Sequence, residues 1–244
     1  MSIKVVLFDL DGTLLPMDLN EFTGVYFKAL ATKLAPLGYE PEPLIKNIWA
    51  GTAAMVKNDG SCTNEDAFWR FFCSIYGPQA REHEPQFEEY YRVEFQNARQ
   101  VCGFAPKAAS VVHMLKKAGM RVALATNPFF PAIATESRIR WAGLEPEDFE
   151  LYTTYENSHY CKPNLRYYEE VCAKLNVSPA ECLMVGNDVG EDMIAQQLGM
   201  QVFLLSDCLI NKANENISVY PHGDFNALET HLTNILKEQS HGCE

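Results

Sequence analysis

The stretch from Ile3 to Leu15 constrains the fold of this chain more than any other. Its first half, IKVVLF, is an apolar run rich in β-branched residues, which is typical of a strand buried on both faces. Two carboxylates, Asp9 and Asp11, follow where this strand is expected to end. In an open sheet of parallel strands, ligands bind at the carboxyl ends of the strands. The sequence therefore predicts a ligand site at the end of the first strand.

The pair Asp9 and Asp11 has to be compensated electrically, because two adjacent carboxylates repel each other unless a cation or a shared proton intervenes. Oxygen ligands suit Mg²⁺, so a divalent ion is the simplest compensation. Gly12 then permits a tight turn, and Thr13 adds a small hydroxyl group. A bare pair of acids after a strand is also common in surface turns, so this pair alone leaves both interpretations open.

The composition is that of an ordinary globular protein. The chain has 244 residues, of which 47% are hydrophobic and 21% are charged. This length accommodates one large domain or a core with a smaller insert. The formal net charge of -12 argues against a nucleic-acid partner, which requires clustered Lys and Arg. The sequence favours no particular oligomeric state.

The hydropathy of the sequence and the spacing of its cysteines indicate a protein of a reducing compartment. No apolar segment approaches the roughly 18 residues needed to span a bilayer, and no signal-peptide pattern is present. We therefore expect a cytoplasmic location without a membrane partner, and free thiols at cysteines that form no CxxC pair. The eight cysteines are Cys62, Cys73, Cys102, Cys161, Cys172, Cys182, Cys208 and Cys243. A zinc site at His159 and Cys161 is a minor alternative.

Helical periodicity replaces strand patterns from about residue 18 to residue 97. Four helices are predicted in this region, at residues 20–37, 43–57, 64–76 and 85–98. Thr63 is the expected N-cap of the third helix. We therefore predict a helical domain of residues 17–100, inserted into a core domain made of residues 1–16 and 101–244.

Helices and strands alternate from Phe104 onward. The helices are predicted at residues 106–117, 132–142, 165–175, 191–198 and 225–238, and the strands at 120–126, 150–154, 182–186 and 201–205. Such alternation implies right-handed crossovers and a doubly wound parallel sheet. The expected fold class is therefore α/β, with an inserted all-α domain.

Two further segments carry polar groups suited to binding phosphate. Thr126 and Asn127 end the second core strand and can donate hydrogen bonds to phosphate oxygens. Pro163 disfavours a helical conformation of Lys162, which places the lysine at the start of a helix, near a preferred anion position. Each segment alone is also compatible with an N-cap or a solvated surface loop.

A fourth segment follows the strand at residues 182–186. Gly186 allows close approach of the backbone to a ligand, and Asp188 and Asp192 add carboxylates. Acids before a helix also simply favour its dipole. All four segments together, each polar and each in order along the chain, are hard to explain without a shared site.

The order of these segments resembles the four motifs of the haloacid dehalogenase-like superfamily of phosphohydrolases. The motifs here are DLDGTL at residues 9–14, TN at 126–127, KP at 162–163 and GNDVGED at 186–192. The helical insert resembles the C1-type cap of phosphoglycolate phosphatases and phosphomutases. The resemblance covers essentially the whole chain and implies a Rossmann-like core with a helical cap. It also implies a Mg²⁺-dependent phosphatase that acts on a small phosphorylated metabolite.

The resemblance also implies roles for individual residues. Asp9 would be the nucleophile that forms an aspartyl-phosphate, and Asp11 the general acid and base. Lys162 would offset negative charge, and Thr126 would act with the backbone N–H of Asn127 on the phosphoryl oxygens. The residues implied to bind the phosphate group are Asp9, Gly12, Thr126, Asn127 and Lys162.

The implied Mg²⁺ site comprises the Asp9 side chain, the backbone carbonyl of Asp11 and Asp188. This chain departs from the commoner fourth motif, because Asn187 stands where an aspartate usually follows the glycine. We therefore assign Asp188 as the direct ligand and expect Asp192 to act less directly or through water. Which of the two acids touches the ion stays open.

Other functions on the same fold remain alternatives. Sugar phosphomutases with a C1 cap share all four motifs, whereas dehalogenases of the family lack an acid at the position of Asp11. A phosphonatase would need a cap lysine, for which the candidates are Lys28, Lys33, Lys46 and Lys57. A non-catalytic protein that binds a phosphate ligand is the alternative from a different class.

The identity of the phosphate ester is not predicted. Trp49, Phe68 and Trp69 favour an interpretation as core residues of the cap over a platform for stacking a base. The Pro-Phe-Phe-Pro run from Pro128 to Pro131 either narrows the pocket or seats the cap. A cap that closes over the site excludes large substrates, so a small metabolite is the expectation.

Overall fold

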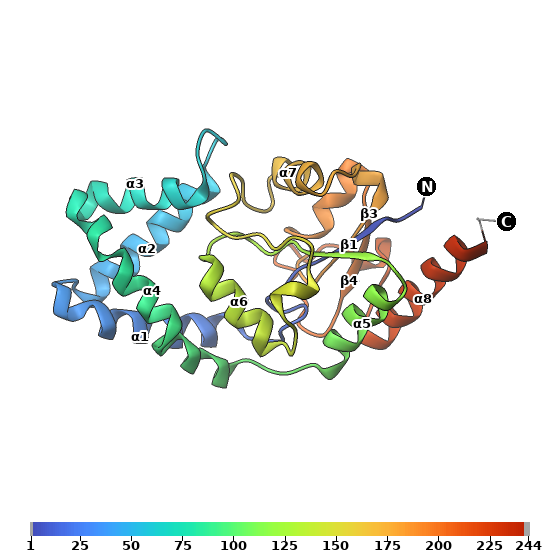
Figure 1. Ribbon diagram of the computed structural model, residues 1–244, viewed down its shortest axis with the longest axis horizontal. Helices are drawn as coiled ribbons and strands as arrows, with labels where there is room; N and C mark the ends of the chain where they lie inside the picture. Colours follow the sequence, from blue (N-terminus) through green and yellow to red (C-terminus); the bar gives the residue numbers. More distant parts are fainter. Residues whose placement is uncertain (1, 242–244) are drawn as a thin grey trace.

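The computed structural model describes residues 2–241, which form a five-stranded parallel sheet with helices packed around it (Figure 1). The strands are β1 (Val5–Phe8), β2 (Arg121–Leu124), β3 (Cys182–Gly186), β4 (Gln201–Leu205) and β5 (His222–Gly223). Their order is β2-β1-β3-β4-β5, and every neighbouring pair is parallel. The expected α/β fold class is confirmed, and β1 lies between β2 and β3.

Helices cover both faces of this sheet. They are α5 (Pro106–Lys117), α6 (Ala132–Trp141), α7 (Leu165–Leu175) and α8 (Phe225–His241), with the 3-10 helices η4 (Pro146–Asp148), η5 (Pro179–Glu181), η6 (Met193–Leu198) and η7 (Ile217–Val219). Val6 and Phe8 of β1 lie in an apolar core with residues of α5, α6 and α8. Val5 and Leu7 lie in a second core with residues of α7 and η6. Because both faces are buried, β1 is apolar at every position.

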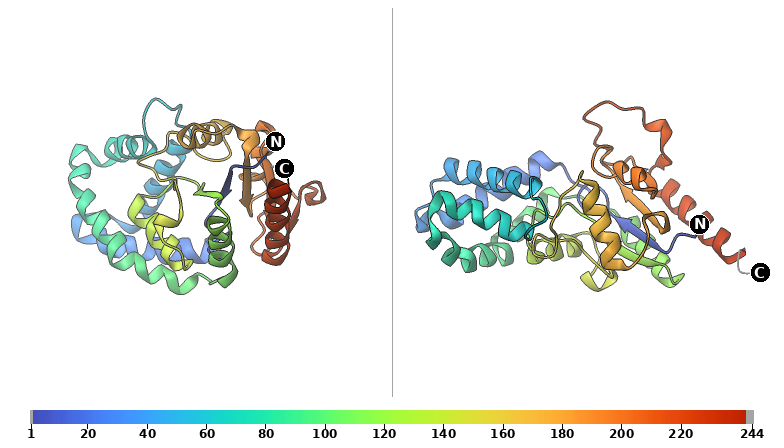
Figure 2. Two further views of the ribbon diagram at one scale, coloured as in Figure 1. Left: turned by 45° about the vertical axis from the view of Figure 1, so that its right-hand side comes forward. Right: turned by 90° about the horizontal axis from the view of Figure 1, so that it is seen from above.

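The insert is a group of helices beside the sheet (Figures 1 and 2). It comprises α1 (Leu19–Leu34), η1 (Ala35–Leu37), α2 (Pro41–Val56), α3 (Asn64–Tyr76), η2 (Pro78–His83), α4 (Glu84–Arg92) and η3 (Glu94–Val101). Thr63 caps α3 as predicted, since its hydroxyl accepts a hydrogen bond from the Asp66 N–H. Aromatic rings fill the interior of the insert; Phe72, for example, lies 5.7 Å from Trp69 and 5.8 Å from Phe87 between ring centroids.

The chain leaves the core and returns to it at adjacent points. Met17 and Cys102 form an antiparallel bridge, and the Gly103 N–H donates to the Pro16 carbonyl at 2.7 Å. The division into an insert of residues 17–100 and a core of the remaining residues stays a prediction.

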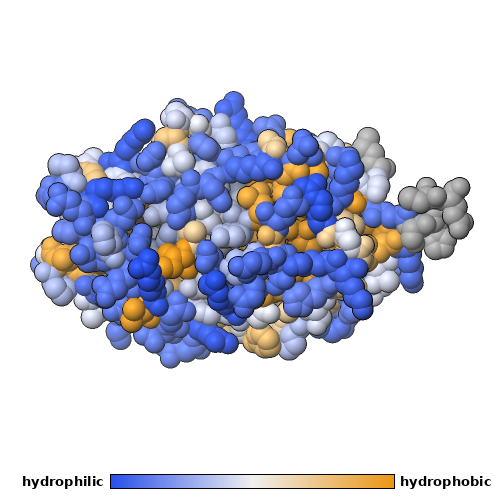
Figure 3. All heavy atoms as spheres, viewed as in Figure 1, coloured by the Kyte–Doolittle hydropathy of each residue, from blue (hydrophilic) through white to orange (hydrophobic). Residues whose placement is uncertain are grey.

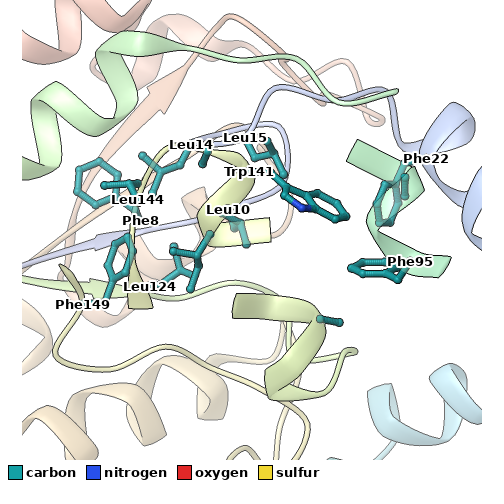
Figure 4. Packing of buried hydrophobic residues seen from close by; sticks show 14 of the residues in the cluster. Phe8, Leu10, Leu14, Leu15, Phe22, Phe95, Leu124, Trp141, Leu144 and Phe149 are labelled. Atoms are coloured by element: carbon teal, nitrogen blue, oxygen red, sulfur yellow. The ribbon is translucent and has the colours of Figure 1, made fainter. Parts of the chain in front are cut away.

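Aromatic residues join the insert to the core (Figure 4). Trp141 of α6 lies 5.0 Å from Phe95 of η3, and Phe95 lies 6.0 Å from Phe22 of α1 between ring centroids. Trp141 also donates its indole N–H to Gln96 at 3.2 Å. The insert therefore packs against α6, the helix that follows the second motif.

Three predicted elements differ in the structure. The expected strand at residues 150–154 is wrong as a regular strand. It lies along β2 through a few backbone hydrogen bonds and an isolated bridge between Leu124 and Tyr152, and beyond it the Tyr155 N–H donates to the Phe130 carbonyl. The expected helix at 191–198 is the 3-10 helix η6, which starts only at Met193. The expected helix at 85–98 is interrupted at Val93. Strand β5 was missed because two residues carry no detectable alternation.

Hydrophilic side chains cover most of the face drawn in Figure 3, with smaller apolar patches between them. Among residues 2–241, no helix has the length and apolar composition to cross a bilayer. Seven cysteines are free thiols, namely Cys62, Cys73, Cys102, Cys161, Cys172, Cys182 and Cys208. Cys243 lies outside the described residues.

Candidate active site

The site lies at the carboxyl edge of the sheet, where three neighbouring strands end together. In the register of the sheet, Phe8 pairs with Leu124 of β2 and Val185 of β3. Asp9, Thr126 and Asn187 follow these strands within two residues and line one cavity. The first, second and fourth predicted segments therefore meet at one place, as the parallel sheet requires.

Lys162 joins the third segment to this place. Its ammonium Nζ lies 2.9 Å from Asp9 Oδ1 and 2.6 Å from Asp192 Oδ1, and its side chain is 1% exposed. Burial alone lowers the pKa of Lys162, but Asp192 and Asp9 outweigh it and hold that pKa well above its usual value. Burial raises the pKa of Asp192 to about 7, against the opposing effect of Lys162. Lys162 is therefore a buried cation that orients one oxygen of Asp9.

The second oxygen of Asp9 faces the turn that follows it. The Thr13 hydroxyl donates toward Asp9 Oδ2 at 3.2 Å and toward Asn187 Oδ1 at 3.0 Å. Gly12 has φ of +83°, and a Cβ built there would lie 2.3 Å from Asn187 Nδ2. Only glycine fits this turn, which brings the first and fourth segments into contact.

Both ends of the Asn127 side chain form hydrogen bonds that connect the second segment to the third and fourth segments. Its Oδ1 accepts the Lys162 N–H at 3.2 Å, and its Nδ2 donates to Glu191 Oε2 at 2.9 Å. The Thr126 carbonyl accepts hydrogen bonds from Thr153 and Tyr167, whereas its hydroxyl bonds to none of the described residues. The Thr126 hydroxyl thus remains available to a ligand. Glu191 was missed by the sequence reasoning, although it stands inside the fourth segment.

Asp11 has a partner that the sequence gave no means of finding. Arg138 of α6 is fully buried and donates from its Nη1 to Asp11 Oδ2. Its guanidinium carbon lies 4.4 Å from the centre of the Phe130 ring. Burial raises the pKa of Asp11, and Arg138 cancels only part of that rise. An arginine in the middle of a helix is normally read as solvent-facing, so no pattern marked Arg138.

The oxygen atoms at the site fit a divalent cation in kind and in charge. Asp11 Oδ1 is buried without a hydrogen-bond partner, and Asp188 uses its Oδ1 to accept the N–H groups of Gly190 and Glu191. Five carboxyl side chains line the cavity, namely Asp9, Asp11, Asp188, Glu191 and Asp192. Two buried cations, Lys162 and Arg138, balance them only in part. Within residues 2–241, no group of three or more Asp, Glu, His or Cys side chains is already arranged to hold a metal ion.

A cavity of about 390 Å³ lies over these residues, between the sheet edge and the insert. Phe129, Phe130 and Pro131 lie in its lining. Phe130 also lies 5.5 Å from the Tyr26 ring of α1 between centroids. The segment from Pro128 to Pro131 therefore both narrows the pocket and contacts the insert, so the two alternatives predicted from the sequence hold together.

Residues 3–198 match the family model described as haloacid dehalogenase-like hydrolase. The chain belongs to this family. The predicted membership of the haloacid dehalogenase-like hydrolases is thereby confirmed, and with it the expectation of an enzyme.

Individual proteins are more distantly similar. Pyrophosphatase PpaX of Bacillus cereus is 24% identical over 214 residues, which cover 87% of this chain and 88% of PpaX. A 2-haloacid dehalogenase from Pseudomonas syringae pv. tomato has a TM-score of 0.61 at 20% identity, covering 97% of this chain and 99% of its own. The haloacid dehalogenase-like hydrolase YfnB of Bacillus subtilis, solved with bound magnesium, has a TM-score of 0.53 at 16% identity, with 95% and 99% covered. These structural similarities establish the fold.

Proposed function

We propose that this hydrolase is a Mg²⁺-dependent phosphatase that cleaves a small phosphate monoester through an aspartyl-phosphate on Asp9. The observation that carries the proposal is the placement of Asp9 in the floor of the cavity, with Lys162 Nζ at 2.9 Å on one oxygen. A carboxylate held in this way is an oriented nucleophile, and the lysine offsets the charge of an incoming phosphate. The similarity to pyrophosphatase PpaX supports phosphoryl chemistry.

Asp11 is suited to proton transfer in both halves of the reaction. In the first half, an oxygen of Asp9 bonds to phosphorus, the bond from phosphorus to the ester oxygen breaks, and Asp11 gives its proton to the leaving alcohol. In the second half, Asp11 takes a proton from water, whose oxygen attacks phosphorus and releases Asp9. The raised pKa of Asp11 favours the protonated form that the first half needs. The presence of Asp11 also favours a phosphate ester over a halogenated substrate, because dehalogenases of the family lack an acid at this position.

Mg²⁺ would be held by the Asp9 side chain, the Asp11 carbonyl and Asp188, with Asp192 acting through Lys162 or a water. When bound, the ion supplies charge neutralisation to the phosphate. The magnesium in YfnB and the excess of carboxylates around the cavity support this assignment. The ammonium of Lys162 binds Asp192 Oδ1 at 2.6 Å. We therefore assign Asp188, and not Asp192, as the direct ligand of the metal ion.

The test of this function is hydrolysis of p-nitrophenyl phosphate with and without Mg²⁺. We expect turnover with Mg²⁺, loss after treatment with EDTA and recovery when excess Mg²⁺ is added back. Turnover that persists in EDTA would contradict the metal requirement. No turnover of any phosphate ester would favour the non-catalytic alternative, and formation of an isomeric phosphate ester instead of free phosphate would indicate a mutase.

The assignment of Asp188 as the direct metal ligand can be tested by the metal dependence of its variant. We expect Asp188→Asn to raise the Mg²⁺ concentration for half-maximal activity at least about tenfold, because a direct ligand is lost. Glu215→Gln is the control, since Glu215 is exposed and outside the described lining of the cavity. The assignment is wrong if Asp188→Asn needs no more Mg²⁺ than the wild type.

The proposal also includes a cytoplasmic location and a small metabolite as the substrate. The described cavity, about 390 Å³, has the size of a site for a small molecule. None of the lysines considered for a phosphonatase is in the described lining of the cavity, and Lys33 pairs with Glu94 at 3.0 Å.

A further inference from the structure

The two sides of the cavity differ in chemistry. The core side carries the carboxylates and buried cations of the candidate active site. The insert side is mostly aromatic and aliphatic, and none of the described insert residues in the lining is charged. Its apolar members include Phe22, Phe27, Ile48, Trp49, Phe68 and Phe87. A phosphate on Asp9 would therefore have its ester group surrounded by apolar side chains.

Most hydroxyl groups on the insert side already form hydrogen bonds within the insert. Thr23 donates to the Leu19 carbonyl at 2.7 Å, and Thr52 donates to the Ile48 carbonyl at 3.0 Å. The hydroxyls of Tyr26 and Tyr91 pair at 3.0 Å. Two polar groups of the described lining stay open to a ligand, namely the Asn20 side chain and the indole N–H of Trp69, which is buried without a hydrogen-bond partner. A polyhydroxylated leaving group would find only these few partners in place of its water, which is unfavourable.

For a second negative charge on the substrate, the described lining offers one exposed cation among several acids. Arg138 and Lys162 are bound by carboxylates, and the remaining cation in the described lining is the exposed Lys212. The other ionisable groups there are acids. A carboxylated leaving group, such as that of phosphoglycolate, is therefore disfavoured.

Aromatic rings on the insert side pair with one another in tilted and edge geometries. Phe27 and Trp49 lie 5.3 Å apart at 50°, and Phe68 and Trp69 lie 5.6 Å apart at 85°. Trp49 is 52% exposed, so it is a wall residue of the cavity mouth and not the core residue expected from the sequence. Rings prefer such offset and edge geometries when they pair.

We propose that the leaving group of the substrate is an uncharged aromatic alcohol, so that the substrates are phosphate monoesters of aryl or arylalkyl alcohols. This inference rests on the proposed phosphatase activity and names its substrate class. The phosphate lies over Asp9, and the ring lies against the insert between Phe27, Trp49 and Phe68.

The experiment compares 2-phenylethyl phosphate with glycerol 3-phosphate and phosphoglycolate, all esters of primary alcohols, in the presence of Mg²⁺. We expect kcat/KM for the phenylethyl ester to exceed the others by about 10- to 100-fold, the effect of burying one ring. Equal or better hydrolysis of glycerol 3-phosphate or phosphoglycolate would overturn the aromatic assignment and leave the phosphatase intact.

Trp49→Ala removes a wall of the cavity without opening the core. We expect it to raise KM for 2-phenylethyl phosphate about fivefold or more and to leave glycerol 3-phosphate unchanged. Phe104→Ala is the matched control, because Phe104 is 59% exposed and outside the described lining. Equal effects of Trp49→Ala on both esters would contradict a ring contact.

A binding measurement separates the two proposals. Benzylphosphonate and methylphosphonate, which are not hydrolysed, are titrated while tryptophan fluorescence is followed, since Trp49 and Trp69 line the cavity. We expect benzylphosphonate to bind at least about tenfold more tightly. If no ester is hydrolysed, the phosphatase proposal fails, and this titration alone decides the aromatic site. Equal affinities, or no binding of either compound, would overturn it.

Discussion

Asp9→Asn is expected to lower kcat for p-nitrophenyl phosphate by at least about 10³-fold, because the amide oxygen is a poor nucleophile toward phosphorus. The fold should survive the substitution. Lys162 keeps its second carboxylate, Asp192, at 2.6 Å, so the buried ammonium is not left unpaired. The measurement is steady-state release of p-nitrophenol with Mg²⁺, together with thermal unfolding of both proteins.

Asp207→Asn is the control for this change, since Asp207 is an exposed aspartate on the loop after β4. It should retain the activity of the wild type. A second readout is the covalent intermediate: acid quenching during turnover should trap phosphate on the wild-type protein and not on the Asp9 variant. Wild-type activity of Asp9→Asn would reject Asp9 as the nucleophile.

Arg138→Met is expected to cost about 1.5–3 kcal/mol of unfolding free energy, because it removes the charged hydrogen bond between Arg138 and Asp11, whose side chain is 20% exposed. Arg138 has a side-chain exposure of 1%, and Asp9 adds further repulsion on Asp11. Methionine preserves much of the side-chain length, so lost packing against Phe130 contributes less. The measurement is chemical denaturation at neutral pH.

Arg140→Met on the same helix is the matched control. Arg140 is 48% exposed and pairs with Glu136 and Glu145 at the surface, so its loss should change stability by less than about 0.5 kcal/mol. Adding Asp11→Asn to Arg138→Met should recover part of the lost stability, since the unpaired charge is then absent. Equal stabilities of the Arg138 and Arg140 variants would show that the ion pair is unimportant.

Patterns local in sequence predicted most of the fold. The sequence correctly predicted β1 and α3. A strand buried on both faces is apolar at successive positions, and a helix buried on one face is apolar at every third or fourth position. The segment at residues 150–154 had the composition of a strand but makes a single bridge. Just beyond it, the Tyr155 N–H donates to the Phe130 carbonyl, a contact that no local pattern records.

The residues that follow strands could be predicted as site residues from local patterns, whereas contacts between distant segments could not. Asp9, Thr126 and Asn187 follow strands, and a parallel sheet brings strand ends together whatever their separation in sequence. Arg138 was missed because its contact with Asp11 crosses 127 residues between a helix and a loop. Roles of these residues in catalysis stay predictions that the variants above test.

If the predicted division into insert and core holds, the neighbouring exit and entry of the chain at Met17 and Cys102 offer a junction for exchanging the helical insert. A foreign module whose own ends lie side by side could be spliced there while the five strands keep their register. Chimeras built at this junction would show whether the proposed phosphate chemistry stays with the core while the selectivity follows the donor of the insert.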